Sequence, residues 1–240
     1  MPSTYTDNAK ICAKFYSLTL NSEETADFVF KKSRAVAGQN VLFVGGMFDI
    51  ARDLKRRGLN ITIVDYSDEM INVAKSVLPD IPSIRSDLRE LPFRNQFDIV
   101  FVVGRVFTHM ITEDDLQKAI SGCKNSLKEN GYLFADNYED TRIQTTNYFN
   151  GQIECSDLTC KIVRDSTTSS LSDSPKIVKW DAHYSGDMDG MPFDFRDTMS
   201  HRAFSRQEFA LELQKYGFQI QEQGDNFDET SFYTFAKIVG

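Results

Sequence analysis

Residues 41–65 read VLFVGGMFDIARDLKRRGLNITIVD, and this stretch decides the fold that we expect. An apolar run at 41–44 breaks at Gly45 and Gly46, a helical pattern follows, and a second apolar run closes on Asp65. A strand, a glycine turn, a helix and a parallel strand form the βαβ unit of nucleotide-binding sheets. The glycines let a ligand approach the backbone, and the carboxylate can accept hydrogen bonds from both hydroxyls of a ribose. The stretch therefore predicts a site for a cofactor that contains adenosine.

Strands and helices continue to alternate as far as residue 136, which predicts a parallel sheet with helices on both faces. The segment FDIVFVV at 97–103 is almost entirely apolar, as is typical of a central strand buried on both sides. Together with two closing strands, the pattern predicts an α/β fold with a doubly wound, mostly parallel, seven-stranded Rossmann-like sheet. We expect strands at 41–44, 60–64, 81–85, 97–103, 131–136, 218–223 and 232–238, and helices at 49–57, 68–77, 113–128 and 206–216.

The pattern changes after residue 150. Three extended stretches, separated by turns rich in Ser, Thr, Asp and Gly, predict an antiparallel layer inserted into the domain. We expect the Ser-rich segment 166–174 to be an exposed hairpin loop. The domain over 1–240 thus has an N-terminal helical lid, 1–38, and an inserted antiparallel β subdomain, 150–204. Its three extended stretches are expected near 158–165, 176–184 and 193–204.

The composition restricts the classes of partner. The chain has 240 residues, of which 41% are hydrophobic, and this supports one domain with a substantial core. Its net charge of −8 repels phosphate backbones, so we expect no nucleic-acid partner. No apolar run approaches the roughly 20 residues of a membrane span, and the first ten residues do not resemble a signal peptide. We therefore expect a cytoplasmic protein with a small-molecule substrate and no membrane partner.

Cysteine and histidine usage argues against a metal site. The four cysteines have no CxxC spacing, and the three histidines stand apart in the sequence. We expect reduced cysteines and no bound metal.

Several segments together resemble a known family. They are VLFVGG at 41–46, VDYSDEMINVAK at 64–75, SDLRELPF at 86–93, FDIVFVVGRVFTHM at 97–110, LKENGYLFAD at 127–136 and HRAFSRQEFALELQKYGFQI at 201–220. In order and character they resemble the class I S-adenosylmethionine (SAM)-dependent methyltransferases, over most of the chain. The inserted layer after the fifth strand resembles the small-molecule branch of that family, which includes amino-sugar N-methyltransferases.

The resemblance implies SAM as cofactor and assigns its contacts. Asp65 would hold the ribose, Asp87 would accept from the adenine amino group, and the Leu88 amide would donate to a ring nitrogen. From the residues alone, other interpretations stay open: Asp65 can cap the next helix, and Asp87 can be a turn residue. The expected cofactor-binding residues are Gly45, Gly46, Asp65, Tyr66, Asp87, Leu88 and Gly104.

The glycine motif departs from the family pattern. Phe43 stands where the family has an acidic residue on the first strand, and the loop GGMFD has two glycines and is one residue short. The missing carboxylate removes a usual partner of the methionine amino group, for which Asp49 is a candidate substitute. NAD fits less well, because the GxGxxG fingerprint is absent.

The acceptor side is expected at the carboxyl ends of the strands. His109 is the candidate catalytic base, although a lone histidine there can also be a hydrogen-bond partner at a helix end. We expect substrate contacts from Tyr16, which together with Phe15 forms either a lid or ordinary helix packing, and from Arg105, Asn137 and Tyr138. The inserted layer can be an aromatic roof that excludes water or a homodimer surface. Its candidate residues are Trp180, His183, Tyr184, Phe193, Phe195, Arg196 and His201.

Three functional hypotheses follow from these features. The leading one is methyl transfer from SAM to a small amine or hydroxyl acceptor. The altered glycine motif also permits a SAM-using cyclase or alkyl transferase that releases methylthioadenosine. The third hypothesis is a non-catalytic SAM-fold protein that acts as a partner or sensor.

Overall fold

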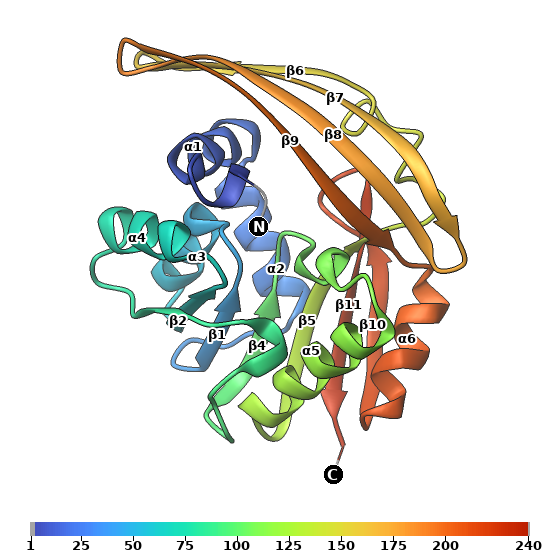
Figure 1. Ribbon diagram of the computed structural model, residues 1–240. Helices are drawn as coiled ribbons and strands as arrows, with labels where there is room; N and C mark the ends of the chain where they lie inside the picture. Colours follow the sequence, from blue (N-terminus) through green and yellow to red (C-terminus); the bar gives the residue numbers. More distant parts are fainter. Residues whose placement is uncertain (1–2, 240) are drawn as a thin grey trace.

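A seven-stranded sheet forms the centre of the computed structural model, which describes residues 3–239 (Figure 1). The strands lie in the order β10-β11-β5-β4-β1-β2-β3, and those from β3 to β5 are parallel, whereas β11 is antiparallel to β5 and β10. This confirms the predicted doubly wound α/β fold. The strands are β1 Asn40–Val44, β2 Asn60–Asp65, β3 Ser83–Arg85, β4 Phe97–Val102, β5 Leu127–Tyr138, β10 Phe218–Asp225 and β11 Ser231–Ile238.

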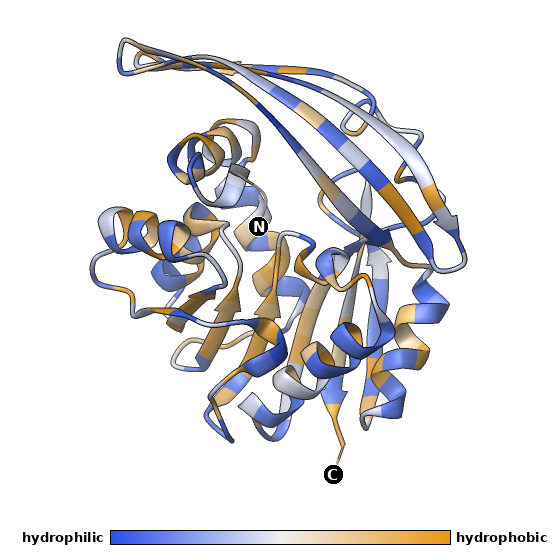
Figure 2. Cartoon of the chain, viewed as in Figure 1, coloured by the Kyte–Doolittle hydropathy of each residue, from blue (hydrophilic) through white to orange (hydrophobic). Residues whose placement is uncertain are grey.

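Helices cover both faces of this sheet, so its central strands are apolar on both sides (Figure 2). On β1, Leu42 and Val44 pack into one hydrophobic cluster, while Val41 and Phe43 pack into the other. The α-helices are α1 Ala9–Thr19, α2 Ser22–Lys32, α3 Phe48–Arg56, α4 Asp68–Val77, α5 Glu113–Ser126 and α6 Arg206–Lys215. Three short 3₁₀ helices are η1 Ser3–Tyr5, η2 Leu88–Glu90 and η3 Val106–His109.

A second, four-stranded antiparallel sheet curves over α1 (Figure 1). Its strands are β6 Gly151–Ser156, β7 Cys160–Asp173, β8 Lys176–Met188 and β9 Met191–Ala203. The segment that forms it leaves and rejoins the main domain at one place, because the Phe204 amide donates to the Tyr138 carbonyl (3.0 Å). A third hydrophobic cluster, the roof cluster, fills the space under this sheet. Its buried members are Ile11, Phe15, Tyr138, Ile143, Phe149, Cys160, Ile162, Val178, Trp180, Ala182, Tyr184, Met199 and Ala203.

The structure corrects three predicted boundaries. The helix expected at 113–128 ends at Ser126, because Leu127 already pairs with Phe97 at the start of β5. The Ser-rich segment 166–174 is not a loop: β7 continues to Asp173 and pairs with β8 along its length. The inserted layer has four strands rather than three, since 151–156 adds an edge strand to β7. Backbone pairing within a hairpin extends these strands beyond the core, where polar side chains remain in solvent.

Within residues 3–239 no helix is long and apolar enough to cross a membrane. Over the same range, no group of three or more His, Cys, Asp or Glu side chains is placed to bind a metal ion. The four cysteines are free, and three of them are buried.

Candidate functional site

A cavity of about 340 Å³ opens at the carboxyl ends of β1, β2 and β4. We call it the strand-end cleft. Its wall contains all seven residues for which cofactor contacts were predicted, together with Tyr16 and His109. These residues come from separate segments of the sequence, and the parallel order of the sheet brings them to one edge.

Two glycines allow the floor of the cleft to form. Gly45 and Gly104 have φ values of 113° and 100°, which side-chain-bearing residues rarely adopt. A Cβ atom at Gly45 would lie 3.0 Å from the Val103 carbonyl oxygen, and one at Gly104 would lie 3.1 Å from the Met47 side chain. The ends of β1 and β4 therefore approach each other closely, with bare backbone facing the cleft.

Asp65 is placed to accept hydrogen bonds from a ligand. Its Oδ1 accepts from the Ser67 amide (2.9 Å), and Ser67, not Asp65, caps α4 through the Met70 amide. This excludes the alternative that Asp65 is the cap of the following helix. Burial raises the pKa of Asp65 to about 6, although the amides of Ser67 and Tyr66 act to lower it.

Asp87 has two roles in the structure. It caps η2 by accepting from the Arg89 amide (2.8 Å), and it forms an ion pair with the Arg89 guanidinium (2.6 Å). Although burial acts to raise it, hydrogen bonds from Arg89 hold the pKa of Asp87 below its usual value. Leu88 follows as the first residue of η2, so its amide has no partner within that helix. The carboxylate and this amide both stand in the wall of the strand-end cleft.

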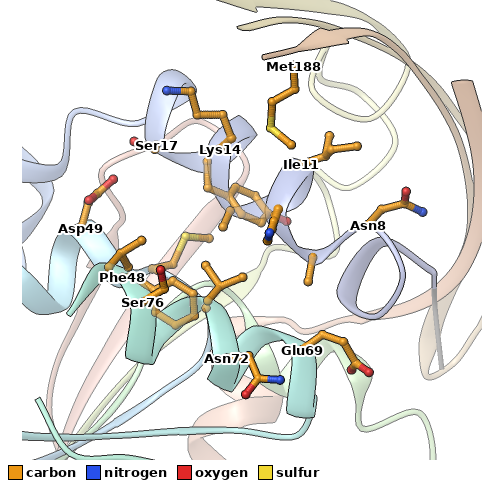
Figure 3. Close-up of a pocket in the computed structure, with 18 of the residues that line it drawn as sticks. Asn8, Ile11, Lys14, Ser17, Phe48, Asp49, Glu69, Asn72, Ser76 and Met188 are labelled. Carbon is orange, nitrogen blue, oxygen red and sulfur yellow. The ribbon is translucent and has the colours of Figure 1, made fainter. Parts of the chain in front are cut away.

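The altered glycine motif has a structural explanation. Phe43 is fully buried between the sheet and its helices, so an apolar residue suits that position. Asp49, the candidate substitute for the missing carboxylate, forms an ion pair with Arg52 and lines a different cavity. This helix cleft, about 970 Å³, lies between α1, α3 and α4 (Figure 3). It shares Tyr16, Gly46 and Met47 with the strand-end cleft.

His109 lies in η3 at the far wall of the strand-end cleft. Its ring meets that of Tyr5 edge-on, with centroids 5.9 Å apart, and lies 5.3 Å from the ring of His201. Burial lowers the pKa of His109 to about 4, so its imidazole is neutral near pH 7. His201 is buried on β9, and its Nδ1 is 2.8 Å from the Thr108 hydroxyl. Sequence reasoning did not assign a role to Tyr5, because nothing in the pattern indicates that η1 returns to the strand ends.

Arg105, Asn137 and Tyr138 do not line this cleft, and the substrate contacts expected of them stay a prediction. The Arg105 side chain is 6% exposed and forms ion pairs with Asp228 and, more loosely, with Asp136 (Nε to Oδ2, 3.8 Å). Tyr138 packs in the roof cluster, and Asn137 is buried on β5. Among the described residues, neither amide atom of the Asn137 side chain has a hydrogen-bond partner.

Asp136 is a structural residue that links β5 to the loop after β4. Its Oδ1 accepts from the amides of Gly104 (2.9 Å) and Arg105 (2.8 Å), and its carboxylate is fully buried. Burial raises the pKa of Asp136, and the nearby Arg105 opposes that shift. These contacts hold Gly104 at the floor of the strand-end cleft.

The predicted roof residues divide between the two faces of the second sheet. Trp180, Tyr184 and His201 are buried, and the ring of Phe195 stacks on that of Tyr184 at 4.9 Å. His183 lies on the opposite face, where it contacts Asp194 (3.0 Å). Phe193 faces the roof cluster. Arg196 is paired in register with His183, so it lies on the opposite face with His183. The strict alternation of side chains along a strand explains this division.

Comparison with known proteins agrees with this geometry. Residues 45–135 match the model of a methyltransferase domain. A solved SAM-dependent methyltransferase from Clostridium acetobutylicum has 17% identity and a TM-score of 0.77, with 98% of each chain covered. SAM-bound CalS10, an amino pentose methyltransferase from Micromonospora echinaspora involved in calicheamicin biosynthesis, has 14% identity and a TM-score of 0.73, covering 91% of this chain and 90% of that one. Streptomyces venezuelae DesVI has 15% identity and a TM-score of 0.73, with 89% of each chain covered. The search of curated proteins found no match.

The fold and the matched segment define the class of protein. This chain carries a methyltransferase domain, set in the fold of SAM-dependent methyltransferases. The class predicted from the sequence, a methyltransferase, is thereby confirmed, and the solved structure of CalS10 contains SAM, the cofactor that was predicted.

Proposed function

We propose that this protein transfers the methyl group of SAM to a nitrogen or oxygen atom of a small molecule. The observation that carries the proposal is the meeting of Gly45, Asp65, Asp87 and Gly104 in one cleft at the strand ends. Gly45, Asp87 and Gly104 follow β1, β3 and β4, and Asp65 is the last residue of β2.

The residues present fit an adenosine-containing sulfonium. At Gly45 the backbone approaches the Val103 carbonyl too closely for a Cβ atom, so glycine leaves bare backbone at the cleft. One carboxylate oxygen of Asp65, Oδ1, accepts from the Ser67 amide, and the other can accept from ribose. When bound, SAM supplies a methyl group on a positively charged sulfur, which is reactive without further activation. The work of the protein is then to hold and orient the reactants and to exclude water.

Different residues would contact the cofactor and the acceptor. Asp65 would hold the ribose, and Asp87 with the Leu88 amide would hold the adenine ring. His109 would accept a proton or a hydrogen bond from the acceptor, because its imidazole is neutral near pH 7. Tyr16 on α1 would close the cleft from above, and the second sheet would exclude water from the acceptor.

Calorimetric titration with SAM and with S-adenosylhomocysteine, followed by product analysis, tests the proposal. We expect both compounds to bind, and S-adenosylhomocysteine to form when a small amine or hydroxyl acceptor from a panel is added. Methylthioadenosine formed from SAM alone would support the cyclase or alkyl-transferase alternative. Failure of both compounds to bind or to raise the melting temperature would contradict a SAM-dependent activity.

The affinity for S-adenosylhomocysteine is expected to fall in acid because of Asp65. Its pKa of about 6 in the free protein means that the carboxyl group is ionised at pH 7 and mostly protonated at pH 5. Ribose hydroxyls donate to the ionised form, so the affinity should fall by about tenfold between pH 7 and pH 5. Calorimetry between pH 7 and pH 5 measures the affinity. The Asp65→Asn variant should bind S-adenosylhomocysteine weakly, and its affinity should not change with pH in this way. A flat profile for the wild-type protein would contradict this role of Asp65.

His109→Gln is expected to lower turnover by about 100-fold while it changes the affinity for S-adenosylhomocysteine by less than about threefold. Glutamine keeps a polar side chain in the cleft but cannot take up a proton. The measurement is the rate of S-adenosylhomocysteine formation with the acceptor found in the panel. His183→Gln, on the outer face of the second sheet, is the matched control and should retain full activity. Unchanged turnover in His109→Gln would exclude it as the base.

A further inference from the structure

The roof cluster surrounds a buried positive charge that the residues around it do not neutralise. Arg164, on β7, has 0% exposure. Its Nη2 donates to the Tyr148 carbonyl oxygen (2.6 Å), whereas Nε and Nη1 have no hydrogen-bond partner. Within residues 3–239, no carboxylate forms an ion pair with Arg164. A guanidinium remains protonated in proteins, and an unpaired buried charge is unfavourable.

Aromatic rings surround the Arg164 guanidinium. Its Cζ lies 5.0 Å from the ring centroid of Phe15, 4.4 Å from that of Tyr148 and 5.1 Å from that of Trp180. Ring faces attract a cation, but they leave its N–H groups unpaired. The indole Nε1 of Trp180 is also buried without a hydrogen-bond partner. In the described part of the chain these N–H donors have no hydrogen-bond acceptor in good geometry, although the side chains of Tyr148 and Tyr184 lie near the guanidinium.

Two chains of contact join these donors to the strand-end cleft. In one, the ring of Trp180 lies 5.6 Å from that of His201, which lies 5.3 Å from that of His109 in the cleft wall. In the other, Phe15 packs edge-on against Tyr16, which also lines the cleft. The unpaired donors thus stand on the side of His109 and Tyr16 that faces the second sheet, where we place the methyl acceptor.

We propose that Arg164 and Trp180 bind a negatively charged group, a carboxylate or a phosphate, on the methyl acceptor. The inference rests on the proposed function, because it places the acceptor beneath the second sheet. The two free nitrogens of the guanidinium match the paired oxygens of an oxyanion, and the indole N–H adds a third donor. A neutral acceptor would leave the guanidinium without a counter-charge. The acceptor is therefore an anionic small molecule with an amine or hydroxyl group.

Trp180 provides a direct probe, because it is the single tryptophan of the chain. We would load the full-length protein with S-adenosylhomocysteine and follow tryptophan emission during titration with sodium acetate and with sodium phosphate. Titration with sodium chloride to the same ionic strength is the reference. We expect a saturable change with at least one oxyanion, and the preferred oxyanion distinguishes a carboxylate from a phosphate.

Variants identify the residue responsible. Arg164→Gln should weaken oxyanion binding by about tenfold or more. Arg164→Lys keeps the charge but loses the planar pair of donors, so it should bind with intermediate strength. Arg196→Gln, an exposed arginine on β9, is the matched control and should respond as the wild-type protein does. Circular dichroism confirms that each variant is folded.

The outcomes separate this inference from the proposed function. No saturable response to either oxyanion in the wild-type protein, or an equal response in Arg164→Gln, would overturn the inference, and the guanidinium would then serve packing alone. If S-adenosylhomocysteine still binds in calorimetry, the proposed function survives that result. If S-adenosylhomocysteine does not bind, the proposed function fails, and the titration without it still tests Arg164.

Discussion

Arg105→Leu is expected to destabilise the protein by about 3–5 kcal/mol. The side chain is 6% exposed and forms ion pairs with Asp136 and Asp228. Its removal would leave the fully buried carboxylate of Asp136 without a neighbouring cation. Because Asp136 also accepts from the amides of Gly104 and Arg105, the loop after β4 should lose its anchor at the same time.

Urea unfolding, followed by circular dichroism, measures this loss of free energy. Lys118→Gln is the control, because Lys118 and its partner Asp114 are both exposed, and we expect it to cost less than about 1 kcal/mol. Equal effects of the two substitutions would mean that the buried ion pairs contribute no more than an exposed one. A change below about 1 kcal/mol in Arg105→Leu would contradict the role given to it.

Asp65→Ala is expected to weaken the binding of SAM and S-adenosylhomocysteine by about 100-fold. A hydrogen bond to a charged group contributes about 1.5–3 kcal/mol, and each 1.4 kcal/mol is a factor of ten in affinity. Two such bonds to ribose, less the cost of keeping Asp65 ionised in a buried position, give an effect of this size. Isothermal titration calorimetry at pH 7 measures it.

Asp68→Ala provides the comparison for this experiment. Asp68 is an exposed carboxylate at the start of α4, three residues from Asp65, and it does not line the strand-end cleft. Its removal should leave the affinity unchanged within about twofold. Wild-type affinity in Asp65→Ala would mean that the cofactor is not held at the end of β2.

The features that could be predicted from the sequence are those with a strong local signal. Apolar runs located β1, β2 and β4, and the helix expected at 68–77 has the bounds of α4. The positions of Gly45 and Asp65 followed from the same reasoning, because parallel strands bring their carboxyl ends to one edge, whereas the roles of Asp87 and Leu88 came from the family resemblance. Asp65 could therefore be placed in the cleft without coordinates.

The errors arose where tertiary contacts outweigh the local pattern. Leu127 continues the apolar face of a helix in the sequence, yet pairing with Phe97 makes it the first residue of β5. Segment 166–173 has the composition of a loop, but its backbone is paired with β8 apart from a bulge at Leu171. The sequence also could not show that Arg105, for which a substrate contact stays a prediction, has Asp228, more than a hundred residues away, as an ion-pair partner.

The hydrogen bond between Phe204 and Tyr138 has a consequence for how this chain can evolve. The inserted segment departs and returns at hydrogen-bonded neighbours, so a short connection between these two residues would preserve the path from β5 to α6. Insertions, deletions and exchanges between them would alter the second sheet while the order of the parallel strands stayed the same. Changes on the outer face of the covering sheet would leave the cleft at the parallel strands intact, whereas changes at His201 would reach it through Thr108 and His109.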